Sequence, residues 1–156
     1  MNKALIAIFF AATGMCAHAQ SSTASPAASS ATLSPIGLWK TVDDETGITK
    51  SEVRLTEADG VVSGRIERLV DPTVRQDSKC IECRDDRKDQ PVIGMEILRS
   101  LKKVDGKDEW EGGTVLDPKN GKVYKATLVP LEDGKKLQMR GYFGFLYRTQ
   151  VWIRVQ

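Results

Sequence analysis

A series of glycine turns divides the chain from residue 35 onward into short segments. The turns lie at Glu45-Thr46-Gly47, Asp59-Gly60, Asp105-Gly106, Asn120-Gly121 and Asp133-Gly134. Asp-Gly and Asn-Gly pairs favour tight hairpins because their residues accept a positive φ. Successive turn glycines are 13 (60 − 47), 46 (106 − 60), 15 (121 − 106) and 13 (134 − 121) residues apart. Three spacings fit one strand plus one turn, and the long spacing must contain additional structure.

The segments between the turns alternate apolar and polar residues, as half-buried strands do. Residues 149–155, for example, put Val151 and Ile153 on one face and Trp152 and Arg154 on the other. This pattern predicts eight extended segments, at residues 36–42, 50–57, 61–69, 92–102, 108–116, 122–129, 135–141 and 148–155.

The predicted fold is all-β, an antiparallel up-and-down β-barrel of about eight strands. Consecutive strands joined by short turns form a meander, and closing it removes the exposed sheet edges. A two-sheet sandwich is the alternative, but it usually needs longer crossovers between its sheets. Residues 92–102 also allow a helix, because Met95, Leu98 and Leu101 are spaced three apart.

The first 19 residues are predicted to be a secretory signal peptide. Lys3 precedes an apolar run over residues 4–12, and Ala17-His18-Ala19 has the small-x-small pattern that signal peptidase recognises. The run is too short to span a bilayer as a mature helix. The alternative is a buried N-terminal helix. We therefore expect cleavage after Ala19 and a periplasmic or secreted mature protein.

Two further features of the N-terminal region bear on export. Cys16 offers an alternative as a lipid-bearing cysteine, although Met15 and Thr13 occupy the positions where a lipoprotein peptidase prefers a small residue and a leucine. Twelve of the fifteen residues 20–34 are Ser, Ala or Thr, which predicts a flexible leader because nothing in it can be buried. The barrel domain is therefore expected at residues 35–156.

Cleavage also changes the chemical inventory of the chain. The mature protein has about 137 residues (156 − 19), two cysteines and no histidine, because His18 leaves with the signal. Ser-His-Asp and Cys-His catalysis are thereby excluded, and we predict that the protein is not an enzyme and uses no cofactor. Its charge is balanced, with 22 Lys and Arg against 21 Asp and Glu, so no nucleic-acid or acidic-membrane partner is expected from its field.

The sequence KCIECRDD at residues 79–86 contains the remaining cysteines, Cys80 and Cys83. A thioredoxin-type pair needs a helix after the first cysteine, whereas the following residues are charged and end at Pro91. A structural zinc site needs four ligands, so aspartates would have to complete it. In an oxidising compartment the two thiols should form a disulfide that pins the long loop at residues 70–91. Redox and metal roles remain the alternatives, and the loop itself is either a lid or a solvated connection.

Several motifs together resemble a known family. In chain order they are GLWKTVDDETG, CIEC, PVIGMEIL, WEGGTVLDPKNGKVYKATL, RGYFG and TQVWIRV. They resemble the bacterial secreted family called domain of unknown function 2147, over residues 35–155. The resemblance implies a lipocalin-like barrel, in which Gly37-Leu38-Trp39 is similar to the G-x-W of the first lipocalin strand. Arg154 is then similar to the arginine that stacks on that tryptophan and closes the barrel end, a contact that contributes about 1 kcal/mol beyond packing.

The interior of an eight-stranded barrel is either filled by side chains or wide enough for one small molecule. The candidate inward residues mix small and large side chains: Ser51, Val53, Gly64, Ile66, Trp110, Gly112, Thr114, Tyr124, Ala126 and Leu128. Small residues among large ones leave room, although alternating sizes also fill the taper of a barrel. We therefore predict a small hydrophobic ligand near Trp110, Tyr124, Arg140 and Tyr142.

Three functions are compatible with these observations. The first is a periplasmic barrel that binds a small apolar molecule or an envelope partner. The second is a thiol-redox factor or enzyme acting through Cys80 and Cys83. The third is a structural envelope interaction module. A calcium site at Asp43-Asp44-Glu45 is less favoured than ordinary turn chemistry, and no metal is predicted.

Overall fold

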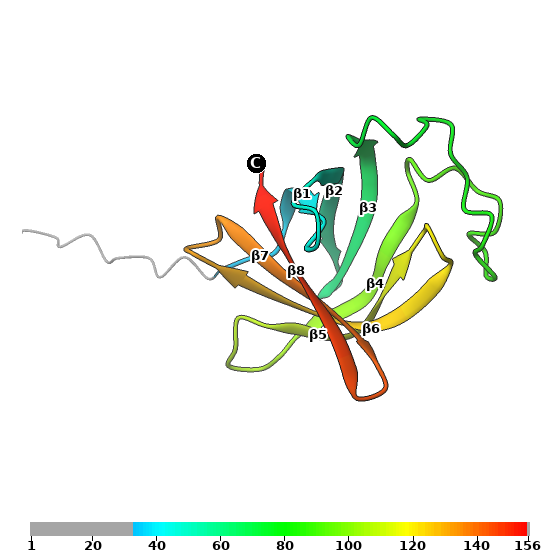
Figure 1. Cartoon of the computed structure of the whole chain (residues 1–156). Helices are drawn as coiled ribbons and strands as arrows, with labels where there is room; N and C mark the ends of the chain where they lie inside the picture. Colours follow the sequence, from blue (N-terminus) through cyan, green and yellow to red (C-terminus); the bar gives the residue numbers. More distant parts are fainter. Residues whose placement is uncertain (1–32, 156) are drawn as a thin grey trace, which may run out of the picture. The chain divides into compact units, whose positions relative to one another are not determined.

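The computed structural model describes residues 33–155, so the predicted signal peptide, Cys16 and nearly all of the predicted leader lie outside the described residues. Eight strands form one closed antiparallel barrel in chain order (Figure 1). They are β1 (Gly37–Val42), β2 (Thr49–Ala58), β3 (Val61–Leu69), β4 (Glu96–Lys103), β5 (Trp110–Asp117), β6 (Lys122–Leu131), β7 (Lys136–Phe143) and β8 (Leu146–Arg154). The predicted up-and-down barrel is confirmed.

The strand alternative for residues 92–102 is also confirmed, although β4 starts only at Glu96. The preceding residues belong to the long loop, where the amide of Val92 donates to the carbonyl of Ser78 (2.9 Å). The predicted turns lie between consecutive strands. At Asn120-Gly121, the glycine has φ 67° and its amide donates to the carbonyl of Asp117 (2.9 Å).

The barrel closes where the first strand meets the last. β1 pairs with β2 over most of its length but with β8 only through Trp39 opposite Arg154 and Lys40 opposite Ile153. β8 turns its tryptophan inward, since Trp152 is 1% exposed whereas Val151 and Ile153 are 39% and 38% exposed. The apolar β-branched side chains of this strand therefore lie on the outside of the barrel.

Large side chains fill much of the interior. Trp39, Leu55, Leu98, Leu128 and Trp152 are all buried. A Cβ added to Gly64 would lie 2.5 Å from Leu55 Cδ2 and 3.1 Å from Leu98 Cβ. The glycine at this position therefore accommodates its neighbours, and the expectation that it leaves room for a ligand is wrong.

Two other small residues do not face the interior as expected. Gly112 is exposed, at φ 78°, and its neighbour Gly113 is the buried glycine of β5. Thr114 lies between the buried residues Gly113 and Val115, so strand alternation turns its side chain outward. The bulge that the glycine pair suggests is present, since the β5–β6 register shifts between Trp110 and Gly113.

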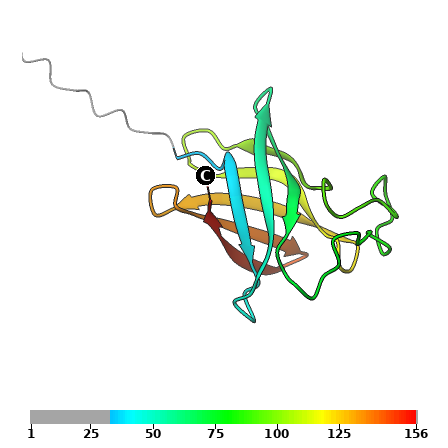
Figure 2. The same ribbon diagram turned by 90° about the horizontal axis from the view of Figure 1, so that it is seen from above.

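The long loop between β3 and β4 carries the predicted disulfide. Cys80 and Cys83 are bonded, with their Cα atoms 5.4 Å apart, and both side chains belong to the same buried cluster as the barrel core. The disulfide segment is seated on the β5–β6 turn, since a Cβ on Gly121 would collide with the backbone of Glu82. Figure 2 shows the loop on the side of the barrel away from the C-terminus.

Charged groups attach the same loop to the strands. Arg87 is buried, donates to the carbonyl of Glu96 (3.0 Å) and pairs with Asp85. Lys50 at the start of β2 donates to Asp71 (2.8 Å). These contacts link the loop to the walls of the barrel.

Among the residues described, no helix is long and apolar enough to cross a membrane.

Candidate functional site

The four residues predicted to contact a ligand do not line one cavity. Trp110 is the first residue of β5 and is buried at the end of the barrel where β1 begins. Tyr124 faces the core near the opposite end. Arg140 and Tyr142 follow the buried Met139 at odd spacing on β7, so they face outward. The prediction that all four residues surround one ligand inside the barrel is therefore wrong. Three of them, Tyr124, Arg140 and Tyr142, do lie around one end of the molecule.

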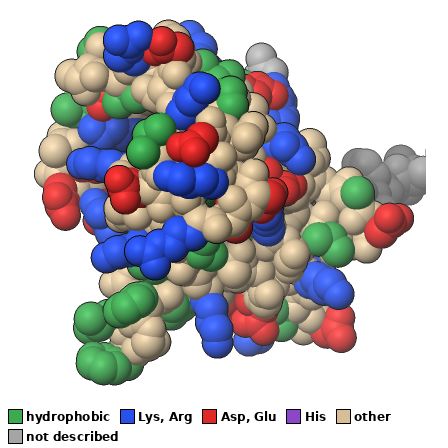
Figure 3. Space-filling view, turned by 90° about the vertical axis from the view of Figure 1, so that its right-hand side faces the viewer, with side chains coloured by type: hydrophobic (Ala, Val, Ile, Leu, Met, Phe, Trp, Pro, Cys, Tyr) green, Lys and Arg blue, Asp and Glu red, His purple; other side chains and the backbone are tan. Residues whose placement is uncertain are grey.

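That end of the molecule carries a cluster of exposed hydrophobic side chains. β7 and β8 are joined at Gly144 and Phe145, and we call residues 143–147 the hairpin tip. Phe145 is 93% exposed, Phe143 69%, Tyr147 62% and Leu146 59%. Figure 3 shows hydrophobic side chains projecting at the bottom of the molecule, where Figure 1 places the end of this hairpin. Contiguous exposed apolar side chains of this kind usually mark an interaction site.

Ring contacts connect the hairpin tip to the barrel wall. The ring centres of Tyr142 and Tyr147 are 6.0 Å apart, and those of Tyr124 and Phe143 are 6.4 Å apart in an edge-on arrangement. The guanidinium of Arg140 lies 4.5 Å from the centre of the Tyr147 ring. Each aromatic pair contributes about 0.5–1.5 kcal/mol beyond its buried area. The exposed rings are therefore supported by neighbours on β6 and β7.

Charge is strongly segregated around the same strands. Residues 118–155 contain eight Lys and Arg against two Asp and Glu, a net charge of +6 (8 − 2). Residues 33–117 contain 14 against 19, a net charge of −5 (14 − 19). The two acidic residues of the basic half, Glu132 and Asp133, lie in the β6–β7 turn at the other end of the barrel. The balanced total therefore conceals an uneven distribution of charge between the two parts of the chain.

The acidic run in the β1–β2 turn is held by turn bonds and by an arginine. Asp43 accepts hydrogen bonds from the amide and hydroxyl of Thr46 (2.9 and 2.8 Å). Arg148 on β8 donates to Asp44 (2.8 Å), and this bond lowers the pKa of the Asp44 carboxyl and raises that of the guanidinium. This geometry favours turn chemistry over calcium binding. No cluster of three metal-ligating side chains occurs within residues 33–155.

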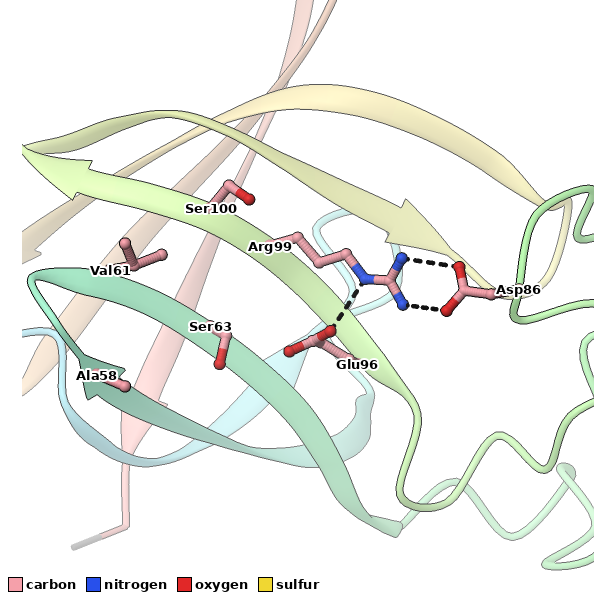
Figure 4. Close-up of a pocket in the computed structure, with 7 residues that line it drawn as sticks. All are labelled: Ala58, Val61, Ser63, Asp86, Glu96, Arg99 and Ser100. Carbon is pink, nitrogen blue, oxygen red and sulfur yellow. Dashed lines mark hydrogen bonds and ion pairs between the residues drawn. The ribbon is translucent and has the colours of Figure 1, made fainter.

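A second candidate is a hollow of about 470 Å³ on the outer side of β3 and β4 (Figure 4). Arg99 lies between Asp86 on the long loop (2.7 and 2.8 Å) and Glu96 (3.0 Å). The Asp86 carboxylate raises the pKa of the guanidinium. The charge of Arg99 is thus already neutralised by the protein, and the rest of the lining consists of Ala58, Val61, Ser63 and Ser100. This hollow is therefore a weaker candidate for a binding site than the hairpin tip.

A family model described as "Uncharacterized protein conserved in bacteria (DUF2147)" matches residues 37–154. The chain belongs to this family. The match extends from the first residue of β1 to the last residue of β8, so the DUF2147 unit is the whole barrel with its long loop. The resemblance inferred from the motifs is confirmed.

One solved structure supports the lipocalin-like description of this DUF2147 barrel. It is protein HP1028 from the human pathogen Helicobacter pylori, which is described as belonging to the lipocalin family. The identity is 22% over 80% of this chain and 84% of that one, with a TM-score of 0.67. At this identity the similarity establishes the fold alone. No curated protein matched the DUF2147 chain.

The hairpin tip was missed by sequence reasoning, although a signal was present. The strands predicted at 135–141 and 148–155 leave residues 142–147 as a connection, and its sequence YFGFLY contains no charged residue and none of the Asp or Asn found at the other turns. A connection that is both exposed and hydrophobic departs from ordinary turn composition. The composition of this connection could therefore have predicted an exposed hydrophobic site.

Proposed function

We propose that this protein is an exported, non-catalytic binding barrel that contacts an apolar partner in the cell envelope through its hairpin tip. One observation carries the proposal. The four highest exposed fractions among the large hydrophobic side chains of residues 33–155 belong to Phe143, Phe145, Leu146 and Tyr147. Keeping such side chains in water is unfavourable, by about 1.5–3 kcal/mol for a fully exposed one, so a partner that covers them gains that free energy.

The packing of the interior supports a surface site over an internal carrier site. Gly64 is in contact with Leu55 and Leu98, and Trp39 and Trp152 fill the end where the barrel closes. Two hollows in the described part of the chain, one over β3 and β4 and one over β2 and β3, lie on the outside of the strands. A small apolar molecule held inside the barrel is therefore the competing outcome of the test below.

The disulfide supports a structural role for the cysteines. Cys80 is 0% and Cys83 2% exposed, whereas thiol–disulfide exchange requires access of an attacking thiolate to the sulfur.

The export part of the proposal rests on the signal-like residues 1–19 and on a disulfide, which persists mainly in oxidising compartments. Mass spectrometry of the exported protein should find a chain that starts at Gln20. An intact Met1 or a lipid group on Cys16 would contradict this.

Binding of a neutral solvatochromic dye such as Nile red tests the surface site. The variant Phe143→Ser/Phe145→Ser/Leu146→Ser should lose most of the dye fluorescence. Its unfolding midpoint should fall only slightly, because these side chains are mostly exposed and the loss is limited to the ring contact of Phe143 with Tyr124. The control is Val151→Ser/Ile153→Ser, which removes exposed apolar side chains from the outer face of β8. Dye binding that is unchanged in the triple variant, with a molecule still co-purifying in native mass spectrometry, would favour the internal site instead.

A further inference from the structure

The side chains of the β7–β8 hairpin are layered by chemistry from its tip upward. Phe145 lies in the turn, and Phe143 is paired with Leu146 in the first layer. The next layer on the outer face is Tyr142 opposite Tyr147. Two residues further along the strands, the cation Arg140 faces Thr149. At about 3.4 Å per residue, Arg140 lies roughly 10 Å above Phe143 along the strand.

This order of side chains is the order of chemical environments at a bilayer surface. Apolar side chains of interfacial proteins reach about 5–10 Å into the boundary between headgroups and acyl chains. Tyrosine rings prefer the headgroup level, and Lys and Arg bind anionic lipids at the surface. Resting on the proposed function, we propose that the partner is an anionic lipid bilayer surface. The hairpin tip inserts into it, with the tyrosine pair at the headgroups and the cations above them.

Cations beside the hairpin complement an anionic surface. Lys125 on β6 is opposite Tyr142 in the sheet register, and both Lys122 and Lys125 are exposed. Arg140 contacts Thr149 and the ring of Tyr147, neither of which is charged. β6, β7 and β8 contain no Asp or Glu, so no carboxylate on these strands competes with lipid phosphates.

The acidic run of the β1–β2 turn, Asp43-Asp44-Glu45, lies on the other side of the hairpin. Arg148 binds Asp44 and lies 3.9 Å from Asp43 and 3.5 Å from Glu45. Arg148 is even-numbered on β8, like the buried Trp152, so it points to the interior side, whereas Tyr147 and Thr149 point outward. The β1–β2 turn therefore flanks the interior side of the hairpin, and the cationic outer face meets the lipid.

The shape of the hairpin tip favours a bilayer over a protein partner. The tip comprises five residues of a single projecting hairpin (Figure 3). Stable protein–protein interfaces bury about 800 Å² on each partner, over about 20–30 residues. A fluid bilayer accepts a narrow apolar projection without a complementary groove.

Vesicle co-flotation of the full exported chain tests this inference. The probe vesicles are phosphatidylcholine alone and phosphatidylcholine with about 30% phosphatidylglycerol, a fraction chosen to give a surface potential of tens of millivolts. The protein should float with the anionic vesicles, bind phosphatidylcholine at least about tenfold more weakly, and be released by salt near 1 M. Equal binding to both vesicle types, or to neither, would overturn the inference.

Two double variants and one charge-matched control locate the contact. Phe143→Ser/Phe145→Ser should abolish flotation, and Lys125→Gln/Arg140→Gln should weaken it on anionic vesicles by about tenfold or more. The charge-matched control Lys102→Gln/Lys107→Gln changes cations near the opposite end of the barrel and should float like the wild type. An equal loss in this control would overturn the inference, because it would show a dependence on total charge alone.

Insertion depth gives a second readout that does not depend on affinity. The three native tryptophans, Trp39, Trp110 and Trp152, are buried. In Phe145→Trp the new indole should shift to the blue with anionic vesicles and be quenched by brominated acyl chains, while Lys107→Trp should do neither. If vesicles never bind but the tip variants still abolish dye binding, the bilayer inference is overturned and the proposed apolar site stands. If dye binding also survives in the tip variants, the proposed function fails as well.

Discussion

The guanidinium of Arg154 lies over the indole of Trp39, with Cζ 4.1 Å from the ring centre. The same guanidinium donates to the carbonyls of Ile36 (2.8 Å), Ser34 (2.7 Å) and Gly134. One side chain of β8 thus joins the segment that enters β1 and the turn between β6 and β7. The predicted closing contact is confirmed, and it lies at the seam where β1 and β8 share few residues.

Removing the indole should destabilise the barrel at this seam. Trp39 is fully buried and its Nε1 donates to the carbonyl of Pro35 (2.7 Å). Trp39→Ala should therefore lower the free energy of unfolding by about 3–5 kcal/mol, measured as the urea midpoint. Arg154→Lys should also lower it, because a lysine cannot reproduce the planar stack and the several directed hydrogen bonds. A midpoint unchanged in Trp39→Ala would show that the seam is not closed by this pair.

A filled interior predicts that enlarging Gly64 is unfavourable. The Cβ of Gly64→Ala would meet Leu55 Cδ2 at 2.5 Å, so overpacking should cost about 1–3 kcal/mol. In a hollow barrel the same change would be neutral or would stabilise by about 0.4–1 kcal/mol, through the unfolded chain. The measurement is again the urea midpoint, repeated in a Leu55→Val background that should recover part of the loss. A stabilising Gly64→Ala would restore the internal ligand site as the better explanation.

The seating of the disulfide loop can be tested with two turn glycines. Gly121 and Gly106 have φ of 67° and 71°, so alanine is strained in both by about 1 kcal/mol or more. At Gly121 the added Cβ would collide with the backbone of Glu82, whereas nothing lies within 4 Å of a Cβ on Gly106. Gly121→Ala should therefore lower the thermal midpoint clearly more than Gly106→Ala. Equal losses would mean that the loop does not rest on the β5–β6 turn.

Acid should weaken the attachment of the long loop. The hydrogen bond from Arg87 lowers the pKa of the Asp85 carboxyl from 3.8 to about 2. Because the folded state binds this proton less well than the unfolded state, the stabilisation is complete above pH about 4 and is lost as the pH falls towards 2. The thermal midpoint should therefore fall over this range, and less steeply in Asp85→Asn. The control is Asp59→Asn, at an exposed turn, which should follow the wild-type curve.

Other carboxyls act in the same direction, so only the difference between the curves is diagnostic. Lys50 and Thr73 lower the pKa of Asp71, and Arg68 lowers that of Glu52. Both groups also lose their contribution on acidification. Parallel curves for wild type and Asp85→Asn would contradict the role assigned to the Asp85–Arg87 pair.

Local chemistry was sufficient to predict the strands and their order. Turn residues that accept positive φ and a two-residue alternation are properties of neighbouring residues, and they located all eight strands to within a few positions. The largest error was at β4, predicted from residue 92 but beginning at Glu96. The four apolar-rich residues before it belong to the disulfide loop, where Val92 and Met95 are buried against the core without joining the sheet. Apolar composition alone cannot distinguish these two forms of burial.

The sequence by itself therefore determined the all-β class. It favoured the closed meander over a sandwich and the disulfide over redox and metal roles, and a family pattern predicted the pairing of Trp39 with Arg154. Only the tertiary structure decided which face of each strand is inside. On β8 both faces contain apolar side chains, and burial of Trp152 in the core leaves Val151 and Ile153 outside. Alternation defines two faces but does not say which is buried, because that depends on the volume the other strands leave free. The same packing turns Arg140 and Tyr142 outward beside Lys125, and thereby creates the surface from which the bilayer contact is inferred.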